Sequence, residues 1–63
     1  MKGYRLEKVG YKAVNGVQEI MSVYYDADEA DAKARLASLD CDYVRVFDYQ
    51  EKVSTIYVNG RIV

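Results

Sequence analysis

Residues 26–40 read DADEADAKARLASLD, a stretch with five alanines and no β-branched residue. Alanine is the strongest helix former among the amino acids. Asp26 or Asp28 is placed to cap the start of a helix, and the acidic side chains that follow favour the positive end of the helix dipole. The stretch therefore predicts one helix over residues 27–39, between two strand-rich parts of the chain.

Two apolar stripes run along this predicted helix. Leucine carries more apolar area than alanine, so the side formed by Ala32, Leu36 and Leu39 is the expected core face. The second stripe consists of alanines alone: Ala27, Ala30, Ala34 and Ala37. Three interpretations of these alanines stay open: a close-packed flank of the same core, a smooth surface for a partner, or plain helix propensity.

Before the helix, residues 4–14 and 17–25 are rich in strand-forming side chains and flank Asn15-Gly16. Asn-Gly favours the type I′ turn of a two-residue hairpin. We expect a long hairpin in which Lys12 lies opposite Glu19. Gly10 is expected to mark a β-bulge in the first strand.

After the helix, residues 43–49 and 53–58 alternate as strands do, with residues 50–52 as a polar turn. A second Asn-Gly, at residues 59–60, favours a short last strand over residues 61–63. The order is ββαββ with a fifth stub. The sequence predicts a single α+β domain over residues 1–63, with two layers: an antiparallel sheet and one helix packed on one face.

One face of this sheet is expected to remain without a helix. Alternation assigns Val44 and Val46 to the core, joined by Ile56 and Val58 from the next strand. The opposite face then gathers aromatic side chains around an arginine, with Val53 and Thr55 beside them. The candidate partner-binding residues on that face are Tyr43, Arg45, Phe47, Tyr49 and Tyr57.

Such a patch points to a partner rather than to chance. Three partners compete: a second copy in a homodimer, another protein, or single-stranded nucleic acid with bases stacked on the rings. Nine basic against ten acidic residues, a net charge of −1, make nucleic acid the least expected of them. A fourth reading is ordinary packing, with a terminal stub folded over the face.

No catalytic constellation can be assembled from these residues. The chain has no histidine and one cysteine, which excludes a Cys-His pair, a structural zinc site and a disulfide within the chain. Cys41 lies between Asp40 and Asp42, whose charges raise a thiol pKa, so a packed residue is expected rather than a nucleophile. The sequence predicts no enzyme, no cofactor and no metal.

No stretch of about 20 apolar residues is present, so no membrane span is expected. The first residues lead into charged side chains and not into the apolar core of a signal peptide. Together with the single cysteine, this predicts a cytoplasmic protein.

Residues 24–30, YYDADEA, and residues 39–47, LDCDYVRVF, resemble the short uncharacterised ββαββ proteins of bacteria and their phages. The resemblance implies no catalytic residues. A common role of phage proteins of this size is to bind and block a host factor, for example a component of a defence system. The expected function is therefore a small non-enzymatic protein-binding module, such as a phage-type inhibitor, with single-stranded nucleic-acid binding as the alternative.

Overall fold

The computed structural model of the chain describes residues 2–10 and 19–63, and the side chains of residues 22–63 within the second range. Each strand pairs antiparallel with its neighbours, and one helix packs on the sheet, so the predicted α+β fold with the order ββαββ is confirmed. The elements are β1 (Tyr4–Val9), β2 (Glu19–Tyr24), α1 (Ala27–Ala37), a 3₁₀ turn η2 (Ser38–Asp40), β3 (Tyr43–Asp48), β4 (Val53–Val58) and β5 (Arg61–Ile62).

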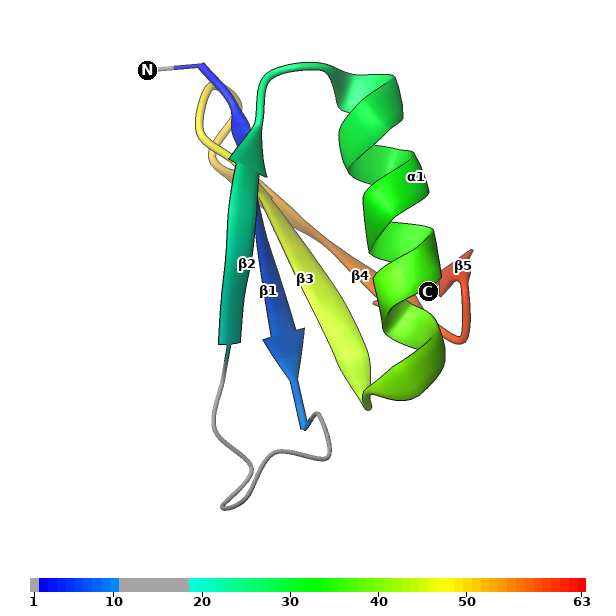
Figure 1. Ribbon diagram of the computed structural model, residues 1–63. Coiled ribbons are helices and arrows are strands. Elements are labelled where there is room, and N and C mark those ends of the chain that lie inside the picture. Colours follow the sequence, from blue (N-terminus) through cyan, green and yellow to red (C-terminus); the bar gives the residue numbers. More distant parts are fainter. Residues whose placement is uncertain (1, 11–18) are drawn as a thin grey trace.

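The strand order in the sheet is β2-β1-β3-β4-β5. Because β1 runs antiparallel to both β2 and β3, these two strands point in the same direction with β1 between them. The chain crosses from one to the other through α1, which lies along one side of the sheet (Figure 1). Leu6, on β1 and under the helix, has an exposed fraction of 0%.

The start of α1 is the predicted one. The Oδ2 atom of Asp26 accepts a hydrogen bond from the backbone N–H of Glu29 at 3.1 Å, which satisfies a donor that the first helical turn leaves free. The α-helix ends at Ala37, and the chain continues as a 3₁₀ turn to Asp40. The helical region thus extends about as far as predicted, with its last turn wound more tightly.

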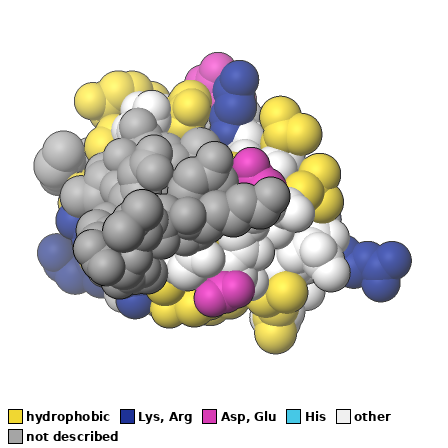
Figure 2. Space-filling view, turned by 60° about the horizontal axis from the view of Figure 1, so that its bottom comes forward, with side chains coloured by type: hydrophobic (Ala, Val, Ile, Leu, Met, Phe, Trp, Pro, Cys, Tyr) yellow, Lys and Arg dark blue, Asp and Glu magenta, His cyan; other side chains and the backbone are white. Residues whose placement is uncertain are grey.

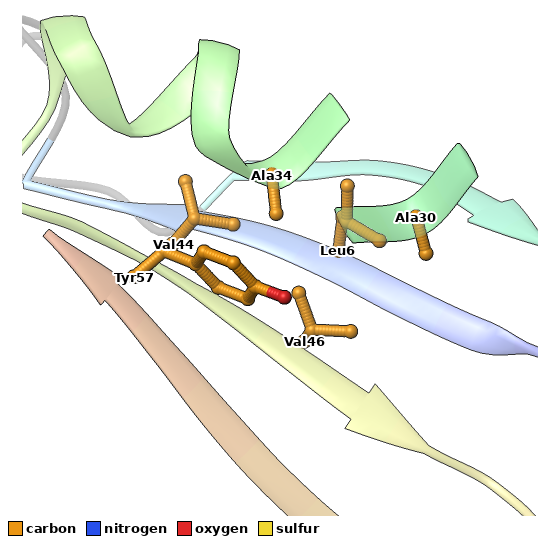
Figure 3. Packing of buried hydrophobic residues seen from close by; sticks show 6 residues of the cluster. All are labelled: Leu6, Ala30, Ala34, Val44, Val46 and Tyr57. Atoms are coloured by element: carbon orange, nitrogen blue, oxygen red, sulfur yellow. The ribbon is translucent and has the colours of Figure 1, made fainter. Parts of the chain in front are cut away.

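The core face of the helix differs from the prediction. Ala30 and Ala34 are buried and point toward the sheet (Figure 3), whereas Leu36 and Leu39 are 68% and 60% exposed. The expectation that the leucine side faces the core is wrong. Alanines bring the helix axis close to the strands, and the larger side chains of the sheet supply the volume: the cluster contains Leu6, Val44, Val46 and Tyr57.

The face assignment of β4 is also reversed. Asp48 lies directly opposite Val53, so the turn has the four residues 49–52 instead of the expected three. A shift of one residue exchanges the two faces of a strand. Ile56 and Val58 therefore point away from the helix, and the core side of β4 carries Val53, Thr55 and Tyr57.

The Asp48 side chain explains the longer turn. Its Oδ1 atom accepts hydrogen bonds from the backbone N–H groups of Gln50 and Glu51, at 2.9 and 3.2 Å. Aspartate commonly initiates turns in this way. The turn then closes through a bond from the N–H of Lys52 to the carbonyl oxygen of Asp48, at 2.8 Å.

The first hairpin has another register than expected. Glu19 lies opposite Lys8 and not Lys12, and the extra residue of the ladder is Met21 of β2 rather than Gly10. Gly10 instead follows the end of β1 with a φ of +72°. The expected turn at Asn15-Gly16 lies outside the described residues.

The second Asn-Gly behaves as predicted. Asn59 and Gly60 have φ values of 53° and 80°, both positive as in a type I′ turn. The turn pairs Val58 with Arg61 and so adds β5 to the edge of the sheet.

Candidate protein-binding face

The strand side chains that point away from α1 form what we call the helix-free face. Residues opposite each other in an antiparallel pair share a face. Tyr43, Arg45 and Phe47 lie opposite Val9, Glu7 and Arg5 of β1, and their neighbours Val44 and Val46 are buried under the helix. The structure thus places these three predicted residues together on the helix-free face.

A buried carboxylate occupies the middle of this face. The Glu7 side chain is 5% exposed, and its Oε1 atom accepts a hydrogen bond from Nε of Arg45 at 2.8 Å. Nε of Arg5 lies 3.6 Å from the other carboxylate oxygen. A charge this deeply buried is tolerated when opposite charges surround it, so the two arginines account for its presence.

The guanidinium of Arg5 also lies over two aromatic rings. Its Cζ atom is 5.6 Å from the ring centroid of Phe47 and 5.7 Å from that of Tyr49, within the range of a cation–π contact. The two rings meet edge to face, with centroids 5.2 Å apart. Tyr49, although it lies in the turn after β3, thereby joins the same cluster.

The cluster is half-buried rather than fully open. Tyr43, Arg45, Phe47 and Tyr49 all have intermediate exposure. The Nε atom of Arg5 is buried without a hydrogen-bond partner, because 3.6 Å is too long for one. The face therefore offers rings and guanidinium groups that are held in place but still reach solvent.

Tyr57, the fifth predicted residue, does not belong to this face. It is 5% exposed and lies under the helix, where its hydroxyl donates to Oδ1 of Asp31 at 2.7 Å. Burial and this bond raise the pKa of Tyr57 to about 12. The prediction that it lies beside Phe47 is wrong, for the same one-residue shift that reverses β4.

Arg5 and Glu7 are the members of the cluster that sequence reasoning missed. Their spacing of two residues places both on one face of a strand. The bulge expected at Gly10 left the face of these residues unassigned, because an extra residue there would have reversed which side chains point to each face of the strand.

A second polar network joins the end of the helix to the β4–β5 turn. Arg35 donates through Nε to Asp31 at 2.9 Å and through a terminal nitrogen to the carbonyl oxygen of Gly60 at 3.0 Å. Its guanidinium, followed by the Tyr57 hydroxyl, lowers the pKa of Asp31. Ser38 Oγ accepts from the N–H of Gly60 at 2.7 Å. Because these donors and acceptors are paired with one another, the network stabilises the packing of the helix end against the β4–β5 turn.

Cys41 lies in a half-buried position after the 3₁₀ turn. Its sulfur lies 3.4 and 3.3 Å from the carbonyl oxygens of Ala37 and Tyr43, either of which can accept its one hydrogen. Burial is the main cause that raises the pKa of this thiol, and the flanking carboxylates of Asp40 and Asp42 add to it. The direction agrees with the prediction, although desolvation contributes more than the neighbouring charges.

Large apolar side chains are exposed near the end of the helix and at β5. They are Leu36, Leu39, Ile62 and Val63. Figure 2 views the molecule from its lower end in Figure 1, and hydrophobic side chains occur there as separate groups among charged ones. This mixed surface is typical of an ordinary protein exterior.

Within residues 2–10 and 19–63, no cleft is found and no three metal-ligating side chains come together. No helix in this part of the chain has the length and apolar character needed to traverse a bilayer. No protein family, curated protein or solved structure matches the chain.

Proposed function

We propose that this chain is a small non-enzymatic protein-binding module that contacts its partner through the helix-free face. The observation that carries the proposal is the cluster of Arg5, Arg45, Phe47 and Tyr49, which is preorganised by Glu7 and by ring contacts yet half-exposed. Arginine and tyrosine are enriched among the residues that contribute most to protein–protein binding. Side chains already held in one conformation lose less entropy on binding.

The partner in this proposal is a second copy of the chain or a different protein. The module acts by occupying the partner's surface, as expected for a phage-type inhibitor of a host factor. Steric occupation requires no nucleophile or general base, and the sequence contains no histidine.

A protein partner is favoured over single-stranded nucleic acid by the position of Arg5. Bases bind such sheets by stacking on open ring faces. In this cluster the Arg5 guanidinium lies over the rings of both Phe47 and Tyr49. The net charge of −1 also provides little attraction for a phosphate backbone.

Matched substitutions test the proposal. Light scattering after size-exclusion chromatography measures self-association, and quantitative affinity capture from the source cells measures binding to other proteins. Of these two kinds of binding, we expect Phe47→Ala to raise the Kd of the tighter one at least about tenfold, or about 1.4 kcal/mol. Tyr25→Ala is the control, because Tyr25 is 73% exposed and lies outside the cluster. Equal effects of the two substitutions, or no effect of Phe47→Ala, would place the interface elsewhere.

A further inference from the structure

The helix-free face has an excess of positive charge. Among the strand residues whose side chains the structure describes, it carries Arg5 and Arg45, and Arg61 joins them because it lies opposite Val58. The acidic residue at these positions is Glu7, which is 5% exposed and already contacts two of the arginines. The charges that reach solvent on this face are therefore guanidinium groups.

Four exposed acids lie at the two ends of the helical segment, away from this face. Asp26, Asp28 and Glu29 are exposed at the start of α1, and Asp40 is exposed after its end. The chain as a whole carries a net charge of −1. The positive charge of the helix-free face is thus a local property of that surface.

The two arginines at Glu7 also have more donors than this carboxylate can accept. A guanidinium has five N–H donors, and a carboxylate offers about four acceptor positions. Arg5 and Arg45 each approach Glu7 through Nε. Most of the about ten donors of the pair therefore remain for another acceptor, and a carboxylate matches the planar fork of a guanidinium with two parallel bonds.

We infer that the helix-free face binds an acidic segment of a different protein, with the partner's carboxylates bound by Arg5, Arg45 and Arg61. The inference rests on the proposed function and specifies the chemistry of the partner. A second copy docked face to face fits poorly, because two-fold symmetry would place this positively charged surface against an identical one. The aromatic rings beside the arginines contact the apolar side chains of the acidic segment.

Fluorescence anisotropy of the full chain at low salt tests this inference. The probes are a labelled decapeptide of alternating glutamate and valine, the same peptide with glutamine in place of glutamate, and labelled oligothymidine of equal length. We expect the glutamate peptide to bind at least about tenfold more tightly than the glutamine peptide, and its affinity to fall as salt screens the charges.

Substitutions locate the binding site. Arg61→Gln, at an exposed position, and Arg45→Gln are expected to weaken binding of the glutamate peptide several-fold, with Arg45→Lys restoring part of the loss. Lys33→Gln removes a charge from an exposed position of α1 and is the matched control. If Arg45→Gln does not fold, as judged by circular dichroism, Arg61→Gln and Arg5→Lys decide the result.

Equal binding of the glutamate and glutamine peptides would overturn the acidic partner, and so would equal losses in Lys33→Gln and Arg61→Gln. If oligothymidine binds more tightly than the glutamate peptide and Arg45→Gln abolishes that binding, the partner is nucleic acid and the inference is overturned. The proposed function is judged separately, by the loss of association in Phe47→Ala but not in Tyr25→Ala. If Phe47→Ala alone weakens association but the glutamate and glutamine peptides bind equally, the face binds proteins without a preference for acids.

Discussion

The two faces of the sheet use a carboxylate, a guanidinium and an aromatic ring in different ways. On the helix-covered face, Asp31, Arg35 and Tyr57 bond to one another between the helix and the sheet. On the helix-free face, the corresponding groups all come from neighbouring strands or the turn beside them: Glu7, Arg5, Arg45, Phe47 and Tyr49. The first set joins two layers, whereas the second stays within one.

This difference separates groups that hold the fold from groups that are available to a partner. The polar atoms between the layers are satisfied by each other and by the β4–β5 turn. Within the single layer, both arginine side chains remain 36% exposed. Contacts across layers resist change, while contacts within a layer leave one side open for recognition.

The largest expected effect concerns the core of the covered face. Leu6→Ala removes a side chain that is 0% exposed, and we expect a loss of about 2–5 kcal/mol in the free energy of unfolding. Leu36→Ala makes the same chemical change at a position that is 68% exposed, and it should cost less than about 0.5 kcal/mol. Urea unfolding measures both values. Similar losses would mean that the leucine side of the helix is packed after all.

The next largest effect concerns Glu7, the buried carboxylate of the helix-free face. Glu7→Gln leaves two guanidinium groups without their carboxylate, and we expect a loss of about 1–3 kcal/mol in the free energy of unfolding. Asp40→Asn is the control, since Asp40 contacts Lys8 at 3.2 Å but its side chain is 53% exposed. Such a surface pair contributes at most about 1 kcal/mol. A smaller loss for Glu7→Gln than for Asp40→Asn would contradict the role given to Glu7.

Tyr57→Phe should have a smaller effect at neutral pH, about 1 kcal/mol, because it deletes the hydrogen bond to Asp31 and little volume. Its signature is the pH dependence. The pKa of Tyr57 is raised from 10.0 to about 12, so the unfolded chain loses this proton first as the pH rises. The stabilisation is complete below about pH 10 and is lost as the pH rises through about 12. Thermal unfolding in alkaline buffers should show a shallower decline for Tyr57→Phe than for the unaltered chain.

Tyr25→Phe serves as the control for this comparison, because Tyr25 is 73% exposed. It should leave both the stability at neutral pH and the alkaline decline unchanged. An alkaline decline that persists in full in Tyr57→Phe would show that other groups cause it.

The smallest effect is chemical and leaves stability unchanged. Because burial raises the pKa of Cys41, less thiolate is present at neutral pH than on free cysteine. We expect a thiol-specific alkylating reagent to modify Cys41 more slowly than free cysteine, and unfolding in urea to remove the difference. A rate in the folded protein equal to that of free cysteine would contradict the burial of this thiol.

The order of elements and the helix start could be predicted because local chemistry determines them. Asp26 caps the helix through a bond three residues away, and the Asn59-Gly60 turn depends on two adjacent residues. The alternation of β3 likewise placed Val44 and Val46 in the core without knowledge of the neighbouring strands.

The errors arose where the outcome depends on tertiary structure. The faces of β4 depend on whether its turn has three or four residues, which the hydrogen bonds of Asp48 decide. The core face of the helix depends on how much volume the sheet provides, and the Tyr57 ring supplies bulk that alanines accommodate and leucines would not. The cluster around Glu7 depends on the pairing of β1 with β3, across 38 positions of the sequence.

The strand order has a consequence for how the chain is assembled and altered. β1 is the first strand in the sequence, but it lies between β2 and β3, so its second neighbour is synthesised only when residues 43–48 emerge from the ribosome. Proteolytic trimming into residues 4–9 would remove the shared neighbour of two strands and divide the sheet. Trimming of residues 61–63 would remove only a two-residue strand at the edge. A tag or fusion is accordingly better tolerated after β5 than directly before β1.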